Sequence, residues 1–144
     1  MRRLVEKYAL GVVIAVLLIL LIDGDLFTLN PYVIAGQLLG LALTLTSRAM
    51  FRKQQFRAVA EPGSGPLVQR GPYKVIRHPV YTGVVILIWA TILGHPDPLN
   101  LVLLVIVTAN VVIRITFEEQ LLRQKYPEFA EYARHTKRMI PFIW

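Results

Sequence analysis

Arg77 and His78 stand next to each other in a polar and aromatic segment, Gly71–Gly83, that lies between long apolar runs. We call this segment the hinge motif. An arginine and a histidine at the edge of an apolar segment are costly without partners, because hydrocarbon offers no water to solvate them. That cost is tolerable where the pair faces a polar cavity. The hinge motif is therefore the first candidate for a site that does chemistry.

Two prolines shape the hinge motif. Pro72 and Pro79 each remove a backbone donor and bias the preceding residue towards an extended conformation, so a plain helix is not expected between them. Pro79 fits the first turn of a new helix, and Gly83 permits the close approach of another backbone or a flat ligand. The alternative is an ordinary cytoplasmic loop, because positive charge gathers on the inner side of a membrane.

A second polar pattern lies in the last long apolar run. Asn110, Arg114 and Glu118 are spaced by four residues, so they share one face of a helix. A polar stripe on a membrane helix is expected to face the protein interior or an aqueous cavity. The alternative is that Arg114 extends to the lipid headgroups and Glu118 pairs with it. Asn110 weakens that alternative, because it lies about 6 Å deeper along the helix.

The composition indicates an integral membrane protein. Hydrophobic residues make up 55% of the 144 residues and the mean hydropathy is +0.52, which is too apolar for an ordinary soluble fold. The chain has no cysteine, so it has no disulfide framework, thiol nucleophile or thiolate metal site, and no metal is expected. The first apolar run lacks a small-residue cleavage site, which does not fit a cleavable signal peptide.

Four apolar runs predict an all-α fold with four transmembrane helices in a single domain, residues 1–144. The predicted helices are Tyr8–Ile22, Tyr32–Phe51, Val80–Leu93 and Leu99–Phe117. The chain accordingly divides into two helices (1–53), a cytoplasmic loop with the hinge motif (54–79), a helical hairpin (80–117) and a C-terminal interfacial helical lid (118–144). The fourth helix ends near Glu118 and Glu119, so this pair and the hinge motif are expected to meet at one cytoplasmic level.

The basic residues predict the orientation. All sixteen lysines and arginines lie outside the two predicted outer turns, Asp23–Asn30 and Gly94–Pro98. By the positive-inside rule both termini are cytoplasmic, and a multi-pass protein of the plasma (inner) membrane with a cytoplasmic active site is expected. The net charge of +7 is then an orientation signal. Membrane lipids are the expected partners, and nucleic acid is not.

Gly36 and Gly40 have the four-residue spacing of closely packed membrane helices. We expect this face of the second helix to pack against the first or the fourth helix. A homo-oligomer contact is the alternative.

The motif Gly-Pro-Tyr-x-x-x-Arg-His-Pro-x-Tyr-x-Gly at 71–83 is followed by Glu118-Glu119, by Phe129-x-x-Tyr132 and by Pro-Phe-Ile at 141–143. This ordered set resembles the signature of the membrane methyltransferases typified by isoprenylcysteine carboxyl methyltransferase, with the phospholipid N-methyltransferases as relatives. The resemblance covers the C-terminal half and implies methyl transfer from S-adenosyl-L-methionine to a hydrophobic or lipidic acceptor. Two positions depart from the family pattern. Phe129 replaces the family's usual tyrosine, and His135 or Arg138 takes the place of a displaced basic residue. Both departures concern the identity of the methyl acceptor.

The resemblance also implies roles for individual residues. The expected cofactor-binding residues are Tyr73, His78, Pro79, Tyr81, Gly83, Glu118 and Glu119. The expected catalytic residues are Arg77, Arg114 and Arg138, which order the hinge motif or orient an acceptor carboxylate. For an amine acceptor, His78 or a glutamate would accept the proton. Phospholipid N-methylation is the alternative reaction, and a non-enzymatic scaffold that binds lipid headgroups is the alternative of another class.

Overall fold

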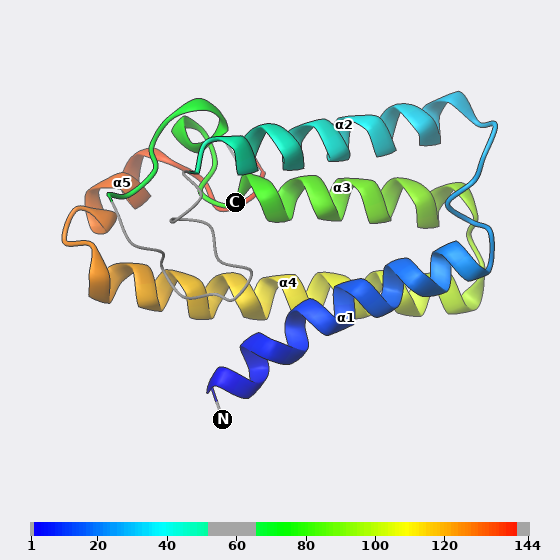
Figure 1. Ribbon diagram of the computed structural model, residues 1–144, viewed down its shortest axis with the longest axis horizontal. Coiled ribbons are helices and arrows are strands. Elements are labelled where there is room, and N and C mark those ends of the chain that lie inside the picture. The colour runs from blue at the N-terminus through cyan, green and yellow to red at the C-terminus, as the bar shows by residue number, and fades with distance from the viewer. Residues whose placement is uncertain (1, 52–65, 141–144) are drawn as a thin grey trace.

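The computed structural model describes residues 2–51 and 66–140, with side chains from residue 8 onward. Within these ranges the chain forms five α-helices, one short 3-10 helix and no strand, so the predicted all-α fold is confirmed (Figure 1). The elements are α1 (Arg2–Ile22), α2 (Pro31–Ala49), η1 (Gly71–Lys74), α3 (Pro79–Gly94), α4 (Pro98–Lys125) and α5 (Phe129–His135).

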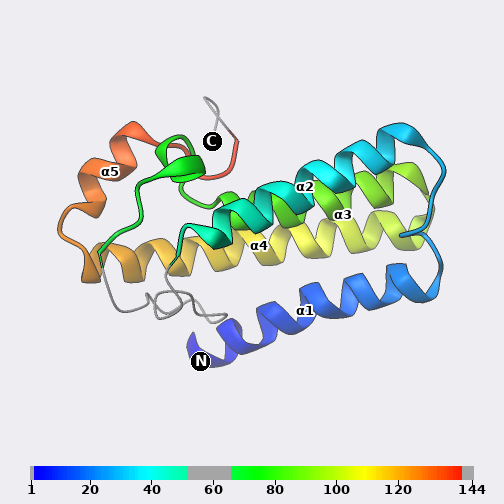
Figure 2. The same ribbon diagram turned by 45° about the horizontal axis from the view of Figure 1, so that its top comes forward.

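The four long helices lie lengthwise beside one another. The α1–α2 and α3–α4 connections lie at one end of the bundle, which we call the turn end, whereas η1 and α5 lie at the opposite end, the α5 end (Figures 1 and 2). The two turns that lack lysine and arginine therefore share one end of the molecule. This geometry agrees with the predicted orientation of the chain.

Two of the helices begin at side-chain caps. The Asn30 side chain accepts a hydrogen bond from Tyr32 N at the start of α2, and Asp97 accepts bonds from Leu99 N and Asn100 N at the start of α4. A proline follows each cap residue, where its missing N–H costs nothing. Both α2 and α4 therefore have a defined first turn.

The turn end is tied together by polar contacts. Asn100, which is 1% exposed, donates through Nδ2 to Asp25 Oδ2 at 2.6 Å and to the His95 carbonyl at 2.8 Å. Gln37 of α2 donates to the Leu26 carbonyl and to Thr91 of α3. These bonds join the two outer turns to each other and to the bundle.

The α2–α3 pair is the closest in the bundle. A Cβ added at Gly40 would lie 2.5 Å from Gly83 O and 2.6 Å from Leu87 N, and one at Gly36 would lie 2.6 Å from Ala90 Cβ. Glycine is therefore required for the two backbones to approach this closely. The prediction that Gly36 and Gly40 face the first or fourth helix is wrong. Their partner is α3, the helix that begins at the hinge motif.

The apolar core joins α1, α3 and α4. Its buried members are Val16, Leu20, Ile88, Ile92, Leu103 and Val107. Many large apolar side chains also point outwards, among them Leu38 and Leu39 of α2 and Val105 of α4, each at least 60% exposed. Such outward apolar faces suit contact with lipid hydrocarbon.

One helix in the described part of the chain, α4, is long and apolar enough to cross a membrane. Tyr8–Ile22 and Pro79–Gly94 are apolar but shorter. The four-span topology and the cytoplasmic position of both termini stay predictions. Length alone does not decide them, because short helices are accommodated by local thinning of a bilayer.

The helical character predicted for the C-terminal lid is found in the end of α4 and in α5, but the boundaries differ from those predicted. The fourth helix does not end at Phe117 but continues as α4 to Lys125, because no helix breaker occurs before Pro127, which disfavours a helical Tyr126. After the short α5, Ile76 and Lys137 form an isolated parallel bridge, so the chain returns to the hinge motif in extended form. The end of the chain from residue 141 on lies outside the described residues.

We expect Gly40→Ala to lower the unfolding free energy by about 1–3 kcal/mol, because the added methyl meets α3 backbone that cannot yield locally. Thermal unfolding in detergent, followed by circular dichroism, measures the effect. Gly11→Ala is the matched control, since a Cβ there meets nothing within 4 Å. Equal melting temperatures for the two variants would show that the α2–α3 contact is not close.

Candidate active site

A buried carboxylate lies at the centre of the α5 end. Glu119 of α4 is 3% exposed, and its Oε1 lies 2.9 Å from Arg77 Nε and 3.4 Å from His78 Nε2. Its Oε2 lies 3.2 Å from Arg138 Nη2. The hinge motif, α4 and residues 136–139, which we call the C-terminal segment, therefore meet at one side chain. A carboxylate so far from water is tolerable only with partners of this kind.

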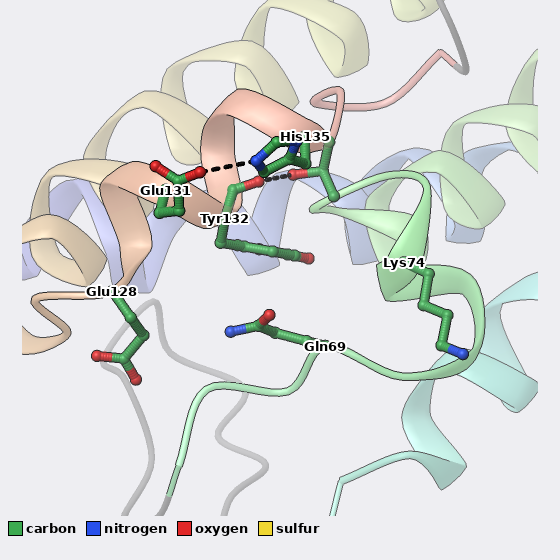
Figure 3. A pocket seen from close by; sticks show the side chains of 7 residues that line it. Gln69, Lys74, Glu128, Glu131, Tyr132 and His135 are labelled. Atoms are coloured by element: carbon green, nitrogen blue, oxygen red, sulfur yellow. Dashed lines mark hydrogen bonds and ion pairs between the residues drawn. The ribbon is translucent and has the colours of Figure 1, made fainter.

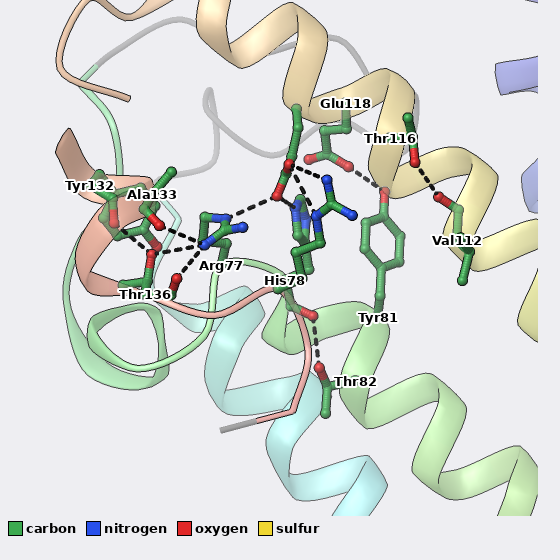
Figure 4. Close-up of polar contacts among 12 residues, drawn as sticks. Arg77, His78, Tyr81, Thr82, Val112, Thr116, Glu118, Tyr132, Ala133 and Thr136 are labelled. Atoms are coloured by element: carbon green, nitrogen blue, oxygen red, sulfur yellow. Dashed lines mark hydrogen bonds and ion pairs between the residues drawn. The ribbon is translucent and has the colours of Figure 1, made fainter. Parts of the chain in front are cut away.

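The neighbouring glutamate has a different environment. Tyr81, on the first turn of α3, donates its hydroxyl to Glu118 Oε2 at 2.6 Å (Figure 4). The same hydroxyl accepts a bond from Arg114 Nε at 2.7 Å. The Arg114 guanidinium also lies 5.4 Å from the centre of the Tyr81 ring. The predicted shared face of Arg114 and Glu118 is confirmed, and Asn110 continues it by donating to the Ala9 carbonyl of α1 at 3.0 Å.

Arg77 connects the hinge motif to the C-terminal segment as well as to Glu119. Its Nη1 donates to the carbonyls of Ala133, at 3.1 Å, and Thr136 (Figure 4). Its backbone N–H donates to the Lys137 carbonyl at 2.7 Å. Arg77 therefore both pairs with a carboxylate and orders the hinge motif, as the sequence led us to expect. Its catalytic role stays a prediction.

Two buried tyrosines, Tyr73 and Tyr132, connect the hinge motif to α5. Tyr132 of α5 donates its hydroxyl to the Tyr73 carbonyl at 2.7 Å, and the Tyr73 ring meets Phe51 edge to face, with ring centres 5.4 Å apart. Burial raises the pKa of Tyr132 to about 12. Burial, and then the charge of Glu118, raise the pKa of Tyr73 well above its usual range. Both phenols are therefore neutral at physiological pH.

Pro79 and Gly83 belong to the start of α3, and both are buried. A Cβ added at Gly83 would lie 2.3 Å from Thr44 Oγ1 and 2.6 Å from Gly40 O. Gly83 was expected to allow the close approach of either another backbone or a flat ligand. The structure shows the first of these, because the α2 backbone lies against it. Its role in cofactor binding stays a prediction.

The structure thus places most of the predicted site residues in one polar network of two adjacent clusters, one around Glu119 and one around Tyr81. The His78 and Tyr81 rings, with centres 5.8 Å apart, connect the two clusters. The members of the network are Arg77, His78, Tyr81, Arg114, Glu118, Glu119 and Arg138. Tyr73 joins it through Tyr132. Thr82 and Thr136 also belong to it, and the sequence analysis did not select them. A single hydroxyl in an apolar or exposed segment carries no signal of its own.

A polar hollow of about 300 Å³ lies beside the network. Its lining residues are Gln69, Lys74, Glu128, Glu131, Tyr132, His135 and Thr136 (Figure 3). Glu131 bonds His135 at 2.7 Å and Arg134 at 3.1 Å on α5. Across residues 2–51 and 66–140, no group of three or more His, Asp or Glu residues is placed to hold a metal ion.

The fold and the network define a helical protein of membrane-like composition, with a polar site built where two helices and the C-terminal segment meet. A family model described as phospholipid methyltransferase matches residues 30–128, so the chain belongs to the phospholipid methyltransferase family, a family of methyltransferases. The resemblance to the membrane methyltransferases is thereby confirmed. No curated protein and no solved structure matches the chain.

Replacing Tyr132 with phenylalanine removes a buried donor and leaves the Tyr73 carbonyl unsatisfied. We expect Tyr132→Phe to lower the unfolding free energy by about 1–2 kcal/mol near neutral pH. The pH dependence should change too. Because the folded pKa is raised to about 12, the proton-linked stability is full below about pH 10 and is lost as the pH rises towards 12.

Melting temperatures measured between pH 8 and pH 11 check both effects. The wild type should lose stability more steeply above pH 10 than Tyr132→Phe. Tyr32→Phe is the control, because Tyr32 is 87% exposed. Parallel curves for the wild type and Tyr132→Phe would contradict the assignment.

Proposed function

We propose that this protein transfers a methyl group from S-adenosyl-L-methionine to a hydrophobic or lipidic acceptor at the cytoplasmic face of the membrane. Membership of a methyltransferase family supports the reaction class. The observation that carries the proposal is the bond between Tyr81 and Glu118, at 2.6 Å. It joins the hinge motif to the glutamate pair, the two parts of the chain in which the chemistry-bearing residues were expected.

The residues present fit the cofactor. S-adenosylmethionine carries a sulfonium, an ammonium and ribose hydroxyls, which suit carboxylate and aromatic partners. Glu118 is half-buried and bonded to Tyr81, so a carboxylate and an aromatic ring stand together. His78 Nε2 is buried and faces Glu119 Oε1 at 3.4 Å without forming a hydrogen bond within the described part of the chain. We assign cofactor binding to Tyr81, Glu118, His78 and the backbone around Tyr73.

The bound cofactor would supply a methyl group that its sulfonium already activates. The chain then has to position the acceptor and exclude water, because in-line transfer depends mainly on geometry. The Arg114–Tyr81–Glu118 bonds fix the Tyr81 ring from both sides of its hydroxyl. Arg138, with a side chain 33% exposed, is better placed than the buried Arg114 to orient a carboxylate acceptor.

Phospholipid N-methylation is the second candidate, and the description of the matching family favours it. An amine acceptor must lose a proton, whereas a carboxylate need not. His78 Nε2 and the Glu118 carboxylate are the candidate proton acceptors. Carboxyl methylation of the isoprenylcysteine type needs no proton acceptor. His78 and Glu118 would then only bind the cofactor, and Arg138 would orient the acceptor carboxylate. The two reactions therefore make different demands on the same network.

The membrane setting of the proposal is a multi-pass protein of the plasma membrane whose α5 end faces the cytoplasm. The basic residues support this orientation, because both outer turns lack lysine and arginine and lie at the opposite end. Association of subunits would provide a larger path by which a lipid acceptor could reach the site from the bilayer. A homo-oligomer remains part of the proposal on that ground.

Calorimetric titration of the detergent-purified protein with S-adenosylhomocysteine tests the cofactor assignment. The wild type should bind saturably, and Glu118→Gln should weaken binding about tenfold or more by removing a carboxylate partner. Glu128→Gln is the control, since this exposed glutamate lines the neighbouring hollow. No binding by folded wild-type protein would favour the lipid-binding scaffold instead.

The acceptor is tested by offering vesicles of phosphatidylethanolamine and, separately, a prenylated cysteine, each with methyl-labelled cofactor. Label in the amine headgroup would identify N-methylation, and base-labile label in the cysteine derivative would identify a methyl ester. For N-methylation, His78→Gln should reduce the rate and make its pH profile less steep, because a proton acceptor is lost. A rate that His78→Gln leaves unchanged would exclude His78 from that role.

A further inference from the structure

We infer that the two adjacent glutamates do different work, and that Glu119 is a positioning residue that holds the C-terminal segment on the hinge motif. By the C-terminal segment we mean residues 136–139. The inference deepens the proposed function and rests on it only for the role left to Glu118. The structural part concerns contacts that exist without any ligand.

Adjacent residues of a helix point in directions about 100° apart. Glu118 consequently reaches Tyr81 and is half-buried, whereas Glu119 points to Arg77 and His78 and is 3% exposed. Two arginines and a histidine lie within 3.4 Å of the Glu119 carboxylate. Its oxygens are thereby engaged by protein groups, and little surface is left through which a ligand could reach them.

The C-terminal segment is paired with the hinge motif along its backbone. Lys137 N donates to the Val75 carbonyl at 3.0 Å, and the Lys137 carbonyl accepts from Arg77 N at 2.7 Å. The Arg138 carbonyl accepts from His78 N at 3.0 Å. Thr82 Oγ1 then donates to the Met139 carbonyl at 3.1 Å. Three backbone bonds and one side-chain bond thus hold residues 137–139 against the hinge motif.

Glu119 is the charge that makes this pairing favourable. Arg77 belongs to the hinge motif and Arg138 to the C-terminal segment, so without a carboxylate between them two like charges would face each other. Removing one partner of a buried ion pair is strongly destabilising because it leaves the other charge unpaired. Loss of the Glu119 charge should therefore release the segment and, with it, the position of His78.

Limited trypsin digestion of the purified full-length protein tests this inference, because trypsin cuts after Lys137 and Arg138. In the wild type the paired backbone should protect both bonds. Glu119→Gln should speed cleavage there about tenfold or more. Glu118→Gln and Glu128→Gln should leave the rate at these bonds unchanged. Cleavage after Arg114, which is buried well inside α4, reports global unfolding and should stay constant in all variants.

Further variants separate positioning from a general loss of structure. Glu119→Asp keeps the charge and should restore most of the protection. Arg138→Gln, whose side chain is partly exposed, should expose the Lys137 bond by itself, and the double variant with Glu119→Gln should add little, because both changes break one contact. If Glu119→Gln does not fold, Arg138→Gln alone decides the matter.

Binding of S-adenosylhomocysteine completes the test. Glu118→Gln should weaken binding with the segment still protected, whereas Glu119→Gln should weaken binding together with protection. Wild-type cleavage rates in Glu119→Gln and Arg138→Gln, or exposure of the same bonds in Glu118→Gln, would overturn the inference. Absence of binding in every protein, with the digestion pattern as expected, would instead refute the proposed function and leave the Glu119 contact established.

Discussion

The buried charge of Glu119 is the constraint on which the α5 end depends. Two segments far apart in the chain bring three cationic or titratable side chains to this carboxylate of α4: Arg77 and His78 from the hinge motif, and Arg138 from the C-terminal segment. Each would be costly to bury alone. Because they meet at one carboxylate, the ion pairs add to the burial of Met139 against Val111 and Ile115 in holding the C-terminal segment in place.

The helix packing delivers these groups to one level. Glycines at 40 and 83 let α2 and α3 approach closely, which fixes the first turn of α3 and therefore Tyr81. The short connection between α3 and α4 makes them antiparallel neighbours, so the start of α3 and the far part of α4 lie side by side. Tyr81 then reaches Glu118 across that interface.

The sequence was sufficient for features that depend on local pattern. Apolar runs predicted all four long helices, with a proline at the start of α2, α3 and α4. Four-residue spacing predicted that Arg114 and Glu118 share a face. Features that depend on distant partners were not predictable in this way. The partner of Gly40 was misassigned because glycine spacing shows a close contact but not its other side. The pairing of Lys137 with the hinge motif follows no periodicity, since it joins segments about sixty residues apart.

The family match ends at residue 128, before α5 and the C-terminal segment. The matched part supplies Tyr81, Glu118 and Glu119, yet Glu119 finds one of its partners, Arg138, beyond it. Whichever acceptor it uses, a methyl-transfer site must position its reactants and hold them apart from water. Under the proposed function, the C-terminal segment, held by the Glu119 ion pairs and by the burial of Met139, would help to keep water from the site.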